Sequence, residues 1–316
     1  MMTGQLFTNP ELSMATLLSA FGPNLEFARD LAPLSSLKTG GKANYFIATG
    51  SAEEISKAVT AARRLKIPFF VIGGGTNLLI SDSGFDGLII RVEVAGLSLR
   101  AETEIECGAG EELKALIDFA TENSLTGLEF AAGIWGTVGG AVYGNAGAYG
   151  GEIGTVVSEI TLVDAKGRLK TVSAEYGRFA YRDSYFKKTR EVIVSTVFKL
   201  AKGQKKAIEQ KISDILTQRE EKYCNLGNSA GCFFKNIPDP KEKYGKLSAG
   251  HLLDKAGAKE LEVGGARVFE KHANIIVNKG NASSKDIRRL ADIMKEKVRD
   301  KFGVELTEEI VQIGDF

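Results

Sequence analysis

The chain has 316 residues, and its 41 Lys and Arg against 40 Asp and Glu give a formal net charge of +1. Charged residues make up 26% and hydrophobic residues 43%, which is typical of globular proteins that bury a core. This balance argues against a strongly basic nucleic-acid-binding protein and against an acidic disordered chain. Three cysteines, two histidines far from any CxxC motif and no secretory signal at the start predict a cytoplasmic protein without a metal site.

Apolar residues recur at helical spacing in four segments. The spacing predicts helices over residues 51–66, 110–124 and 205–222, and a last helix through Ile287–Val298. Ser51 followed three residues later by Glu54 predicts a capping box at the start of the first helix.

Short apolar or alternating runs predict strands between these helices. Residues 68–72 predict a buried strand, and residues 78–92 alternate and turn like a β-hairpin. Between about Leu88 and Leu200 most runs are strand-like, and Lys166–Gly167 predict the turn of another hairpin. The pattern as a whole predicts an α+β fold with a boundary near residue 200.

Residues 130–151 are uncharged and carry glycines at the spacing of transmembrane helix contacts, at Gly136, Gly140 and Gly144. However, eight of these 22 residues are glycine, and no Lys or Arg flanks them closely. Each glycine weakens a helix in water by roughly 0.8–1 kcal/mol relative to alanine. A glycine-rich loop that lines a ligand is the better interpretation, and no membrane insertion is expected.

Another glycine-rich segment, Gly73–Asn77, is the first of the two in chain order and directly follows a predicted strand. Consecutive glycines let backbone N–H groups converge on a phosphate. The segment is not a P-loop, because no Lys follows in the right place, and a strand rather than a helix comes next. Two such segments in one domain favour an extended dinucleotide cofactor. A tight turn and an irregular packed loop are the alternatives.

Three further segments offer side chains for chemistry. Arg182, between aromatic residues, could bind a carboxylate or enolate oxygen, or could simply cover a tyrosine at the surface. Cys232 could be a proton donor, a nucleophile or a small core residue. Glu308 and Glu309 precede a strand-like run, so one of them is expected to point inward and act as an acid, unless both are solvated.

Together and in this order, these segments resemble the UDP-N-acetylmuramate dehydrogenase (UDP-N-acetylenolpyruvoylglucosamine reductase) family, the flavoenzymes that reduce UDP-N-acetylenolpyruvoylglucosamine in peptidoglycan synthesis. The resemblance runs from about Leu37 to Gly314. The matching segments are LKTGGKANYF, VIGGGTNLLISD, EFAAGIWGTVGGAVYGNAGAYGGEI, YRDSYF, the helix end Arg219–Lys222, SAGCFFKN, EVGGARVFEKHANIIVN and GVELTEEIVQIG. The chain lacks an inserted subdomain after YRDSYF, like the shorter subclass without the tyrosine-bearing loop.

The resemblance implies a two-lobed FAD-binding domain of the PCMH or vanillyl-alcohol-oxidase type plus a C-terminal α+β substrate domain. The implied segments are an N-terminal arm (1–25), a first α/β FAD-binding lobe (26–85), a second, mainly antiparallel lobe (86–202) and the substrate-binding domain (203–316).

The resemblance also implies FAD as cofactor and NADPH as hydride donor, with Gly73–Leu78 at the FAD pyrophosphate. Residues 1–200 contain no histidine for a covalent link, so dissociable FAD is expected. The cofactor-binding positions fall on Ile72, Gly73, Gly74, Gly75, Thr76, Asn77, Leu78, Ala132, Gly133, Gly136, Thr137, Gly139, Gly140, Asn145, Ala146 and Ile193.

The family's catalytic positions fall on Arg182, Cys232 and Glu309. The resemblance implies that Arg182 and a neutral Glu309 stabilise the charge that forms beside the substrate carboxylate, and that Cys232 protonates the adjacent carbon. The substrate-binding positions fall on Tyr181, Lys222, Asn236, Lys259 and His272.

Three residues depart from the family pattern: Cys232 replaces the usual Ser, Trp135 a Pro and Gln312 an Arg. Two alternatives stay open, and these three residues motivate the second. One is another FAD oxidase or dehydrogenase of the same wider fold, and the other is a flavin- or nucleotide-sugar-binding protein without activity. A UDP-sugar is the expected ligand, and no nucleic acid or obligatory protein partner is expected.

Overall fold

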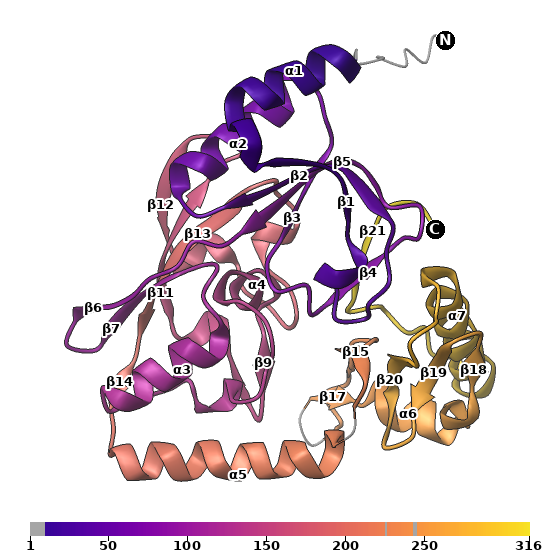
Figure 1. The fold of residues 1–316 in the computed structure, drawn as a ribbon. Helices are drawn as coiled ribbons and strands as arrows, with labels where there is room; N and C mark the ends of the chain where they lie inside the picture. The colour runs from indigo at the N-terminus through magenta and orange to yellow at the C-terminus, as the bar shows by residue number, and fades with distance from the viewer. Residues whose placement is uncertain (1–9, 225, 243–244) are drawn as a thin grey trace. The chain divides into compact units, whose positions relative to one another are not determined.

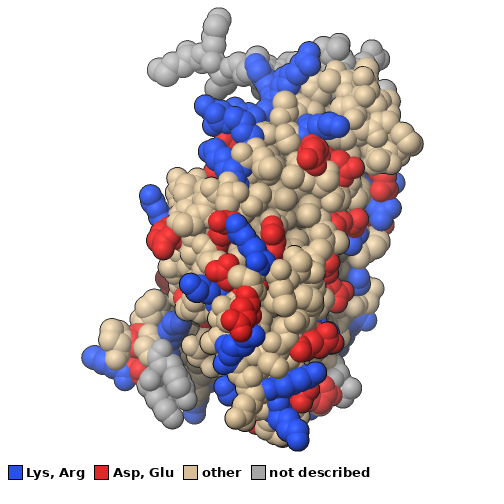
Figure 2. Space-filling model, turned by 90° about the vertical axis from the view of Figure 1, so that its left-hand side faces the viewer, with Lys and Arg blue, Asp and Glu red and all other residues tan. Residues whose placement is uncertain are grey.

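The structure is a computed structural model that describes residues 10–224, 226–242 and 245–316. The chain forms two compact units that alternate along the sequence (Figure 1). Unit 1 consists of Met1–Arg29, Ala43–Gly73 and Asp86–Ile208, and unit 2 consists of Asp30–Lys42, Gly74–Phe85 and Glu209–Phe316. The boundaries expected at residues 25, 85 and 202 stay a prediction. On the face shown in Figure 2, acidic and basic side chains are interspersed, in keeping with the near-zero net charge.

The first sheet of unit 1 has the strand order β1-β2-β5-β3, with β3 parallel to β5 (Figure 1). Its strands are β1 (Leu25–Asp30), β2 (Lys42–Thr49), β3 (Phe69–Ile72) and β5 (Phe85–Val92). Helix α2 (Ala52–Arg64) confirms the first predicted helix and buries Ile55, Ala58, Val59 and Ala62. Ser51 caps this helix by accepting a hydrogen bond from the Glu54 backbone, but the Glu54 carboxylate accepts from Gly50 rather than from Ser51.

Residues 10–21 of the expected N-terminal arm form helix α1 (Pro10–Phe21), in which Leu17 is fully buried, and residues 1–9 lie outside the described residues. Single-turn 3-10 helices follow at η1 (Gly22–Asn24) and η2 (Ala32–Leu34).

The second sheet of unit 1 is antiparallel throughout, in the order β12-β11-β13-β7-β6. Its strands are β6 (Leu97–Ala101), β7 (Glu104–Gly108), β11 (Val157–Val163), β12 (Leu169–Ser173) and β13 (Val192–Lys199). Strands β11 and β12 form the hairpin predicted around Lys166–Gly167. Helix α3 (Leu113–Glu122) buries the predicted residues Leu113, Leu116, Ile117 and Ala120. The short strands β8 (Leu125–Thr126) and β14 (Ala201–Lys202) pair with each other.

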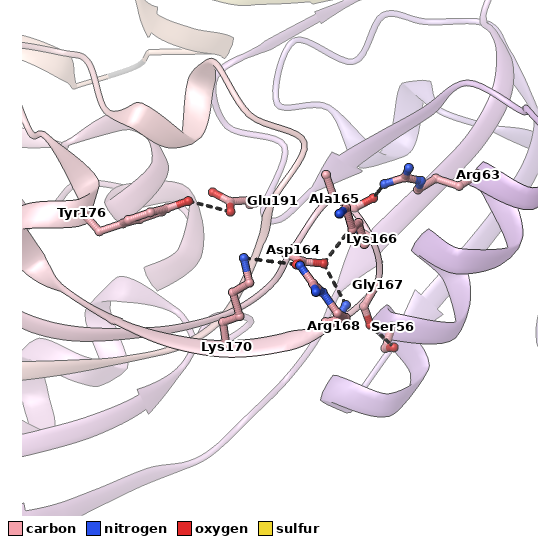
Figure 3. Close-up of polar contacts among 10 residues, drawn as sticks. All are labelled: Ser56, Arg63, Asp164, Ala165, Lys166, Gly167, Arg168, Lys170, Tyr176 and Glu191. Carbon is pink, nitrogen blue, oxygen red and sulfur yellow. Dashed lines mark hydrogen bonds and ion pairs between the residues drawn. The ribbon is translucent and has the colours of Figure 1, made fainter.

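The β11–β12 turn is organised around Asp164, which is only 3% exposed (Figure 3). Its carboxylate accepts hydrogen bonds from the backbone N–H groups of Lys166 (2.8 Å) and Arg168 (2.9 Å). It also pairs with the side chains of Arg168 (2.8 Å) and Lys170 (3.1 Å). Burial raises the pKa of Asp164, but these donors outweigh burial and hold the pKa well below its ordinary value.

The second glycine-rich segment of the sequence, residues 130–151, is not the loop that was expected. Val138–Gly144 form helix α4, which Thr137 caps by accepting a hydrogen bond from the Gly140 backbone at 3.3 Å. Buried Val138, Ala141 and Val142 anchor the helix, so packing overrides the low helix propensity of glycine. Short elements flank it and complete unit 1: η3 (Glu129–Ala131), β9 (Gly147–Ala148), β10 (Gly151–Glu152), η4 (Ile153–Thr155), η5 (Ala174–Gly177) and η6 (Tyr185–Lys187). None of the described helices is long and apolar enough to cross a membrane.

The main sheet of unit 2 has the order β15-β20-β19-β18, and all its pairs are antiparallel. Its strands are β15 (Asn228–Cys232), β18 (Glu262–Val263), β19 (Ala266–Phe269) and β20 (His272–Asn278). Helices α6 (Ala249–Lys255) and α7 (Ser284–Phe302) share its core, in which Ile287, Leu290, Ala291, Met294 and Val298 are buried as predicted. Helix α5 (Lys205–Tyr223) confirms the third predicted helix. Unit 2 also contains β16 (Ile237–Pro238), its partner β17 (Lys246–Leu247) and η7 (Ala258–Glu260).

The hairpin predicted over residues 78–92 is wrong. Strand β4 (Leu78–Ile80) pairs in parallel with β21 (Val311–Ile313), and β5 lies between β2 and β3. The turn between them is held in unit 2, because the Asp82 carboxylate accepts hydrogen bonds from the Ser284 (2.9 Å) and Lys285 (3.3 Å) backbones. Both bonds satisfy N–H groups in the first turn of α7, which have no partner within the helix.

Candidate active site

The two glycine-rich segments meet in unit 1 at Gly73 and Thr137. A Cβ on Gly73 would clash with the Thr137 hydroxyl, so this approach requires glycine. Since Thr137 is also the N-cap of α4, the contact places the end of β3 beside the start of that helix. The start of the first glycine-rich segment therefore contacts the N-cap of α4 within unit 1.

The rest of the first glycine-rich segment lies in unit 2, where its backbone is oriented by its neighbours. The Gly75 carbonyl accepts a hydrogen bond from the Ser36 N–H (3.0 Å), and the Asn77 carbonyl accepts one from the Val311 N–H (3.0 Å). In a planar trans peptide the carbonyl and the next N–H point in opposite directions. The N–H groups of Thr76 and Leu78 therefore point away from Ser36 and Val311, an orientation suited to phosphate oxygens.

Helix α4 has one face without side chains. A Cβ on Gly144 would meet no atom within 4 Å, and one on Gly140 would meet only the Thr137 hydroxyl at 3.4 Å. Packing within the protein thus does not require these two glycines, although each weakens the helix by roughly 0.8–1 kcal/mol relative to alanine. A flat ligand lying against the helix backbone would require them. The predicted cofactor residue Gly140 therefore fits a bound FAD.

Other predicted cofactor residues belong to the core of unit 1. Gly139 packs against Ala109, where a Cβ would lie 2.9 Å from the Ala109 side chain. Ile72, Ala132 and Ile193 are buried, and Asn145 is completely enclosed.

Arg182 lies in a tight turn that the protein holds firmly. Ala180 and Asp183 exchange two backbone hydrogen bonds of 3.0 Å, and Arg182 at the tip has a φ of +52°. The Arg182 guanidinium donates to the Gly147 carbonyl at 2.7 Å and lies 5.5 Å from the centre of the Tyr181 ring. Such strained backbone is often found at functional sites. Arg182 is thus a positioned cation and not a loose surface side chain.

The predicted catalytic residues of unit 2 lie on neighbouring segments. Cys232 ends β15 opposite Ile275 of β20. The carbonyl of the next residue, Phe233, accepts a hydrogen bond from the Glu309 N–H at 2.8 Å, and the Asn77 side chain donates to the Glu309 carbonyl at 3.2 Å. Unit 2 therefore brings Cys232, Glu309 and part of the first glycine-rich segment together, whereas Arg182 belongs to unit 1.

The two adjacent glutamates have different surroundings. The Glu308 side chain is only 15% exposed and pairs with Arg288 (3.3 Å) and Lys295 (3.4 Å) of α7. The Gln312 side chain also donates a hydrogen bond to Glu308. Successive side chains of an extended segment point to opposite sides. Glu309 therefore faces away from α7. The hydrogen bond from Gln312 to Glu308 could not be predicted from the sequence.

Three of the predicted substrate-binding residues influence one another in unit 2. The pKa of His272 is lowered, first by burial and then by the positive charges of Lys222 and Lys259. The Tyr223 ring lies 6.0 Å from the His272 ring, and Lys259 pairs with Asp254 at 3.0 Å. Asn236 accepts a hydrogen bond from the Ala249 N–H at 3.1 Å, and Tyr181 belongs to unit 1. Lys222, which is exposed, and Lys259 thus form a cluster of positive charge near the half-buried His272, which suits a diphosphate.

Comparison with known proteins agrees with this chemistry. Residues 43–173 match the family described as FAD binding domain, and residues 221–313 match the C-terminal domain of UDP-N-acetylenolpyruvoylglucosamine reductase. The chain is 36% identical over 281 residues to the UDP-N-acetylenolpyruvoylglucosamine reductase of Caldanaerobacter subterraneus subsp. tengcongensis, covering 89% of this chain and 91% of that protein. The chain belongs to the UDP-N-acetylenolpyruvoylglucosamine reductase family.

Two further relatives show how far this likeness to the reductase family extends. The reductase of Clostridium botulinum (strain Alaska E43 / Type E3) is 36% identical over 280 residues, covering 89% of this chain and 90% of that one. The crystal structure of the reductase from Thermus caldophilus matches with a TM-score of 0.77 at 29% identity, covering 92% of this chain and 98% of that one. The α+β fold with an FAD-binding domain and the FAD cofactor, both expected from the sequence, are thereby confirmed.

Proposed function

We propose that this protein reduces the enolpyruvyl group of UDP-N-acetylenolpyruvoylglucosamine to give UDP-N-acetylmuramate, with NADPH as the hydride donor, in the synthesis of peptidoglycan precursors. The observation that carries the proposal is the 36% identity to reductases across 89% of the chain. A likeness that extends over both units favours this reaction over another oxidase or dehydrogenase that shares only the FAD-binding fold. The cytoplasm as its location, and the lack of an obligatory protein partner, stay predictions from the sequence.

Bound FAD supplies the hydride that reduces the substrate double bond. Gly73–Leu78 would hold its pyrophosphate through backbone N–H groups, which the Gly75 and Asn77 carbonyl contacts orient. The open backbone of α4 at Gly140 would accept a flat part of the cofactor. The other predicted cofactor residues of both glycine-rich segments would complete the site, except for Asn145, which is fully enclosed.

Arg182, Glu309 and Cys232 would perform the chemistry on the substrate. Hydride addition to the distal vinyl carbon leaves negative charge beside the substrate carboxylate. The fixed guanidinium of Arg182 and the carboxyl group of Glu309 would stabilise that charge. The Cys232 thiol would then donate a proton to the adjacent carbon.

Lys222, Lys259 and His272, with Asn236 and Tyr181, would bind the UDP part of the substrate. Lys222 and Lys259 both lower the pKa of His272, which means that their positive charges lie near its ring. This supports the assignment, because a diphosphate would neutralise those charges.

The product formed by the purified protein tests the proposal. We expect continued NADPH oxidation, beyond the one equivalent that reduces bound FAD, only when UDP-N-acetylenolpyruvoylglucosamine is added, with a product that has gained two hydrogens. Glu309→Gln is expected to reduce turnover by about a hundredfold or more. The matched control Glu308→Gln, in the neighbouring residue paired with α7, is expected to stay within about tenfold of the wild type.

Other outcomes would contradict the proposal. Rapid oxygen consumption with alcohols would favour an oxidase of the wider fold. A flavin spectrum that NADPH does not bleach would favour a binding protein without activity. If Glu308→Gln and Glu309→Gln were equally impaired, the assignment of Glu309 would be wrong.

A further inference from the structure

Helix α4 is connected to the Arg182 turn by three hydrogen bonds, all of which involve residues 143–147. The Ser184 hydroxyl donates to the Tyr143 carbonyl (2.7 Å), and the Arg182 guanidinium donates to the Gly147 carbonyl (2.7 Å). The third bond runs from the Asn145 side-chain amide to the Ala180 carbonyl (2.8 Å). The segment that ends α4 therefore also holds the turn at three points, namely Ala180, Arg182 and Ser184.

Asn145 is the central member of this connection. Its amide nitrogen donates to Ala180, and its amide oxygen accepts a hydrogen bond from the Gly154 N–H at 2.8 Å. The Ala180 carbonyl also accepts the backbone hydrogen bond from Asp183 that closes the turn. One side chain thus connects the end of α4, the residues after β10 and the base of the Arg182 turn.

The same residue is inaccessible to a ligand. Asn145 is 0% exposed, because protein atoms alone enclose it, so neither its backbone nor its amide offers a surface that FAD could touch. This burial does not fit the direct cofactor contact that the family resemblance implies for Asn145. It fits a residue that acts through its neighbours.

The chemistry of position 145 favours asparagine. The residue caps α4 in the left-handed conformation, with φ 45° and ψ 58°, which asparagine and glycine adopt more readily than other residues. The site also needs one donor and one acceptor on the same short side chain. Aspartate would place a carboxylate oxygen against the Ala180 carbonyl, and glycine would provide neither group.

We propose that Asn145 is a positioning residue for Arg182, which holds the turn with its guanidinium in a fixed relation to helix α4. The proposal rests on the proposed function, in which Arg182 stabilises charge on the substrate and α4 lines the cofactor. It assigns Asn145 to the step in which the substrate is reduced, and not to FAD binding or to the reduction of FAD by NADPH.

Asn145→Gly tests the proposal, because glycine keeps the left-handed conformation and removes only the amide. We expect normal FAD content and normal flavin reduction by NADPH, but reoxidation by UDP-N-acetylenolpyruvoylglucosamine slowed by about 10- to 100-fold. The matched control is Asn123→Gly, at the C-terminus of α3 in the same unit, which removes another asparagine amide that donates to a backbone carbonyl at 2.8 Å. It is expected to leave both half-reactions unchanged.

Two further measurements separate positioning from a general loss of structure. Arg182→Lys should slow reoxidation in the wild type but add little in Asn145→Gly, since both changes remove the same interaction with substrate. In addition, hydrogen exchange of the Ala180 and Asp183 amides should be faster in Asn145→Gly than in Asn123→Gly.

The outcomes distinguish failure of the inference from failure of the proposed function. Loss of FAD from Asn145→Gly, additive effects of the two substitutions, or unchanged exchange of the turn amides would overturn the positioning role. If Arg182→Lys reoxidised at the wild-type rate, the catalytic assignment of Arg182 would be wrong. The exchange measurement would still decide whether Asn145 fixes the turn.

Discussion

A methyl group added to the open face of α4 at Gly140 is expected to stabilise the FAD-free protein but to weaken the binding of FAD. Alanine at position 140 would meet only the Thr137 hydroxyl, at an ordinary contact distance of 3.4 Å. Replacing an unstrained helical glycine by alanine stabilises a protein by about 0.4–1 kcal/mol. For Gly140→Ala we therefore expect the FAD-free protein to unfold about 1–3 °C higher.

The same methyl group would occupy space that the cofactor needs. Forcing a methyl group into a close-packed contact costs about 1–3 kcal/mol, which corresponds to a roughly 5- to 150-fold higher Kd for FAD. The matched control is Gly50→Ala, just before α2 in the same unit, where a Cβ would meet only the Glu54 carboxylate at 3.8 Å and no cofactor contact is predicted. It should raise the unfolding temperature of the FAD-free protein and leave the Kd unchanged.

The assay combines thermal unfolding of the FAD-free protein with FAD titration followed by flavin fluorescence. A lower unfolding temperature for Gly140→Ala would show that protein packing requires this glycine. An unchanged Kd would show that the cofactor does not lie against this face of α4. Either result would refute the claim that position 140 is glycine because FAD lies against it.

The remaining predictions concern two titrating side chains. Because the folded-state pKa of Asp164 is lowered, its stabilising effect is present above the unfolded pKa of about 3.9 and is lost as the pH falls below that value. Asp164→Asn should therefore lower stability at neutral pH by about 1–3 kcal/mol. The difference from the wild type should shrink in acid, and a constant difference would contradict this account. For His272, Lys259→Met should raise the pKa towards its ordinary value, though not fully, because burial remains the largest cause of the shift. NMR titration can measure this, since the chain has only two histidines, and an unchanged pKa would rule out the cationic cluster.

The helices show which features of the fold the sequence predicts well. Helices α2, α3 and α7 bury apolar residues at helical spacing, and this periodicity is a local property of the sequence. Helix α4 was not predicted because its glycines hide a short pattern of buried Val138, Ala141 and Val142. Thr137, which caps α4, is also a common residue type in loops, so it did not indicate a helix start.

The pairing of strands that are distant in the chain could not be predicted from the local sequence pattern. Residues 78–92 have the alternation of a hairpin, but the partner of β4 is β21 at the other end of the chain. Alternation predicts a strand and says nothing about which strand lies beside it. The same holds for Asp82, whose role is set by the N-terminus of α7.

The candidate site was located mainly by family resemblance, and the structure adds how its parts are held. Arg182 was named from the sequence, but its turn is fixed through backbone carbonyls at Tyr143, Gly147 and Ala180. Backbone acceptors carry no residue-type signal. For this reason neither Ser184 nor the enclosed position of Asn145 could be inferred from the order of residues.

Anaerobic measurement of the two half-reactions tests the central claim most directly. The purified protein with FAD would be reduced by NADPH while the oxidised flavin band is followed, and UDP-N-acetylenolpyruvoylglucosamine would then be added. The account predicts bleaching by NADPH and reoxidation by that substrate in the wild type, with reoxidation lost in Glu309→Gln. Bleaching without reoxidation would assign the protein a different acceptor, and the absence of any bound flavin would contradict the account as a whole.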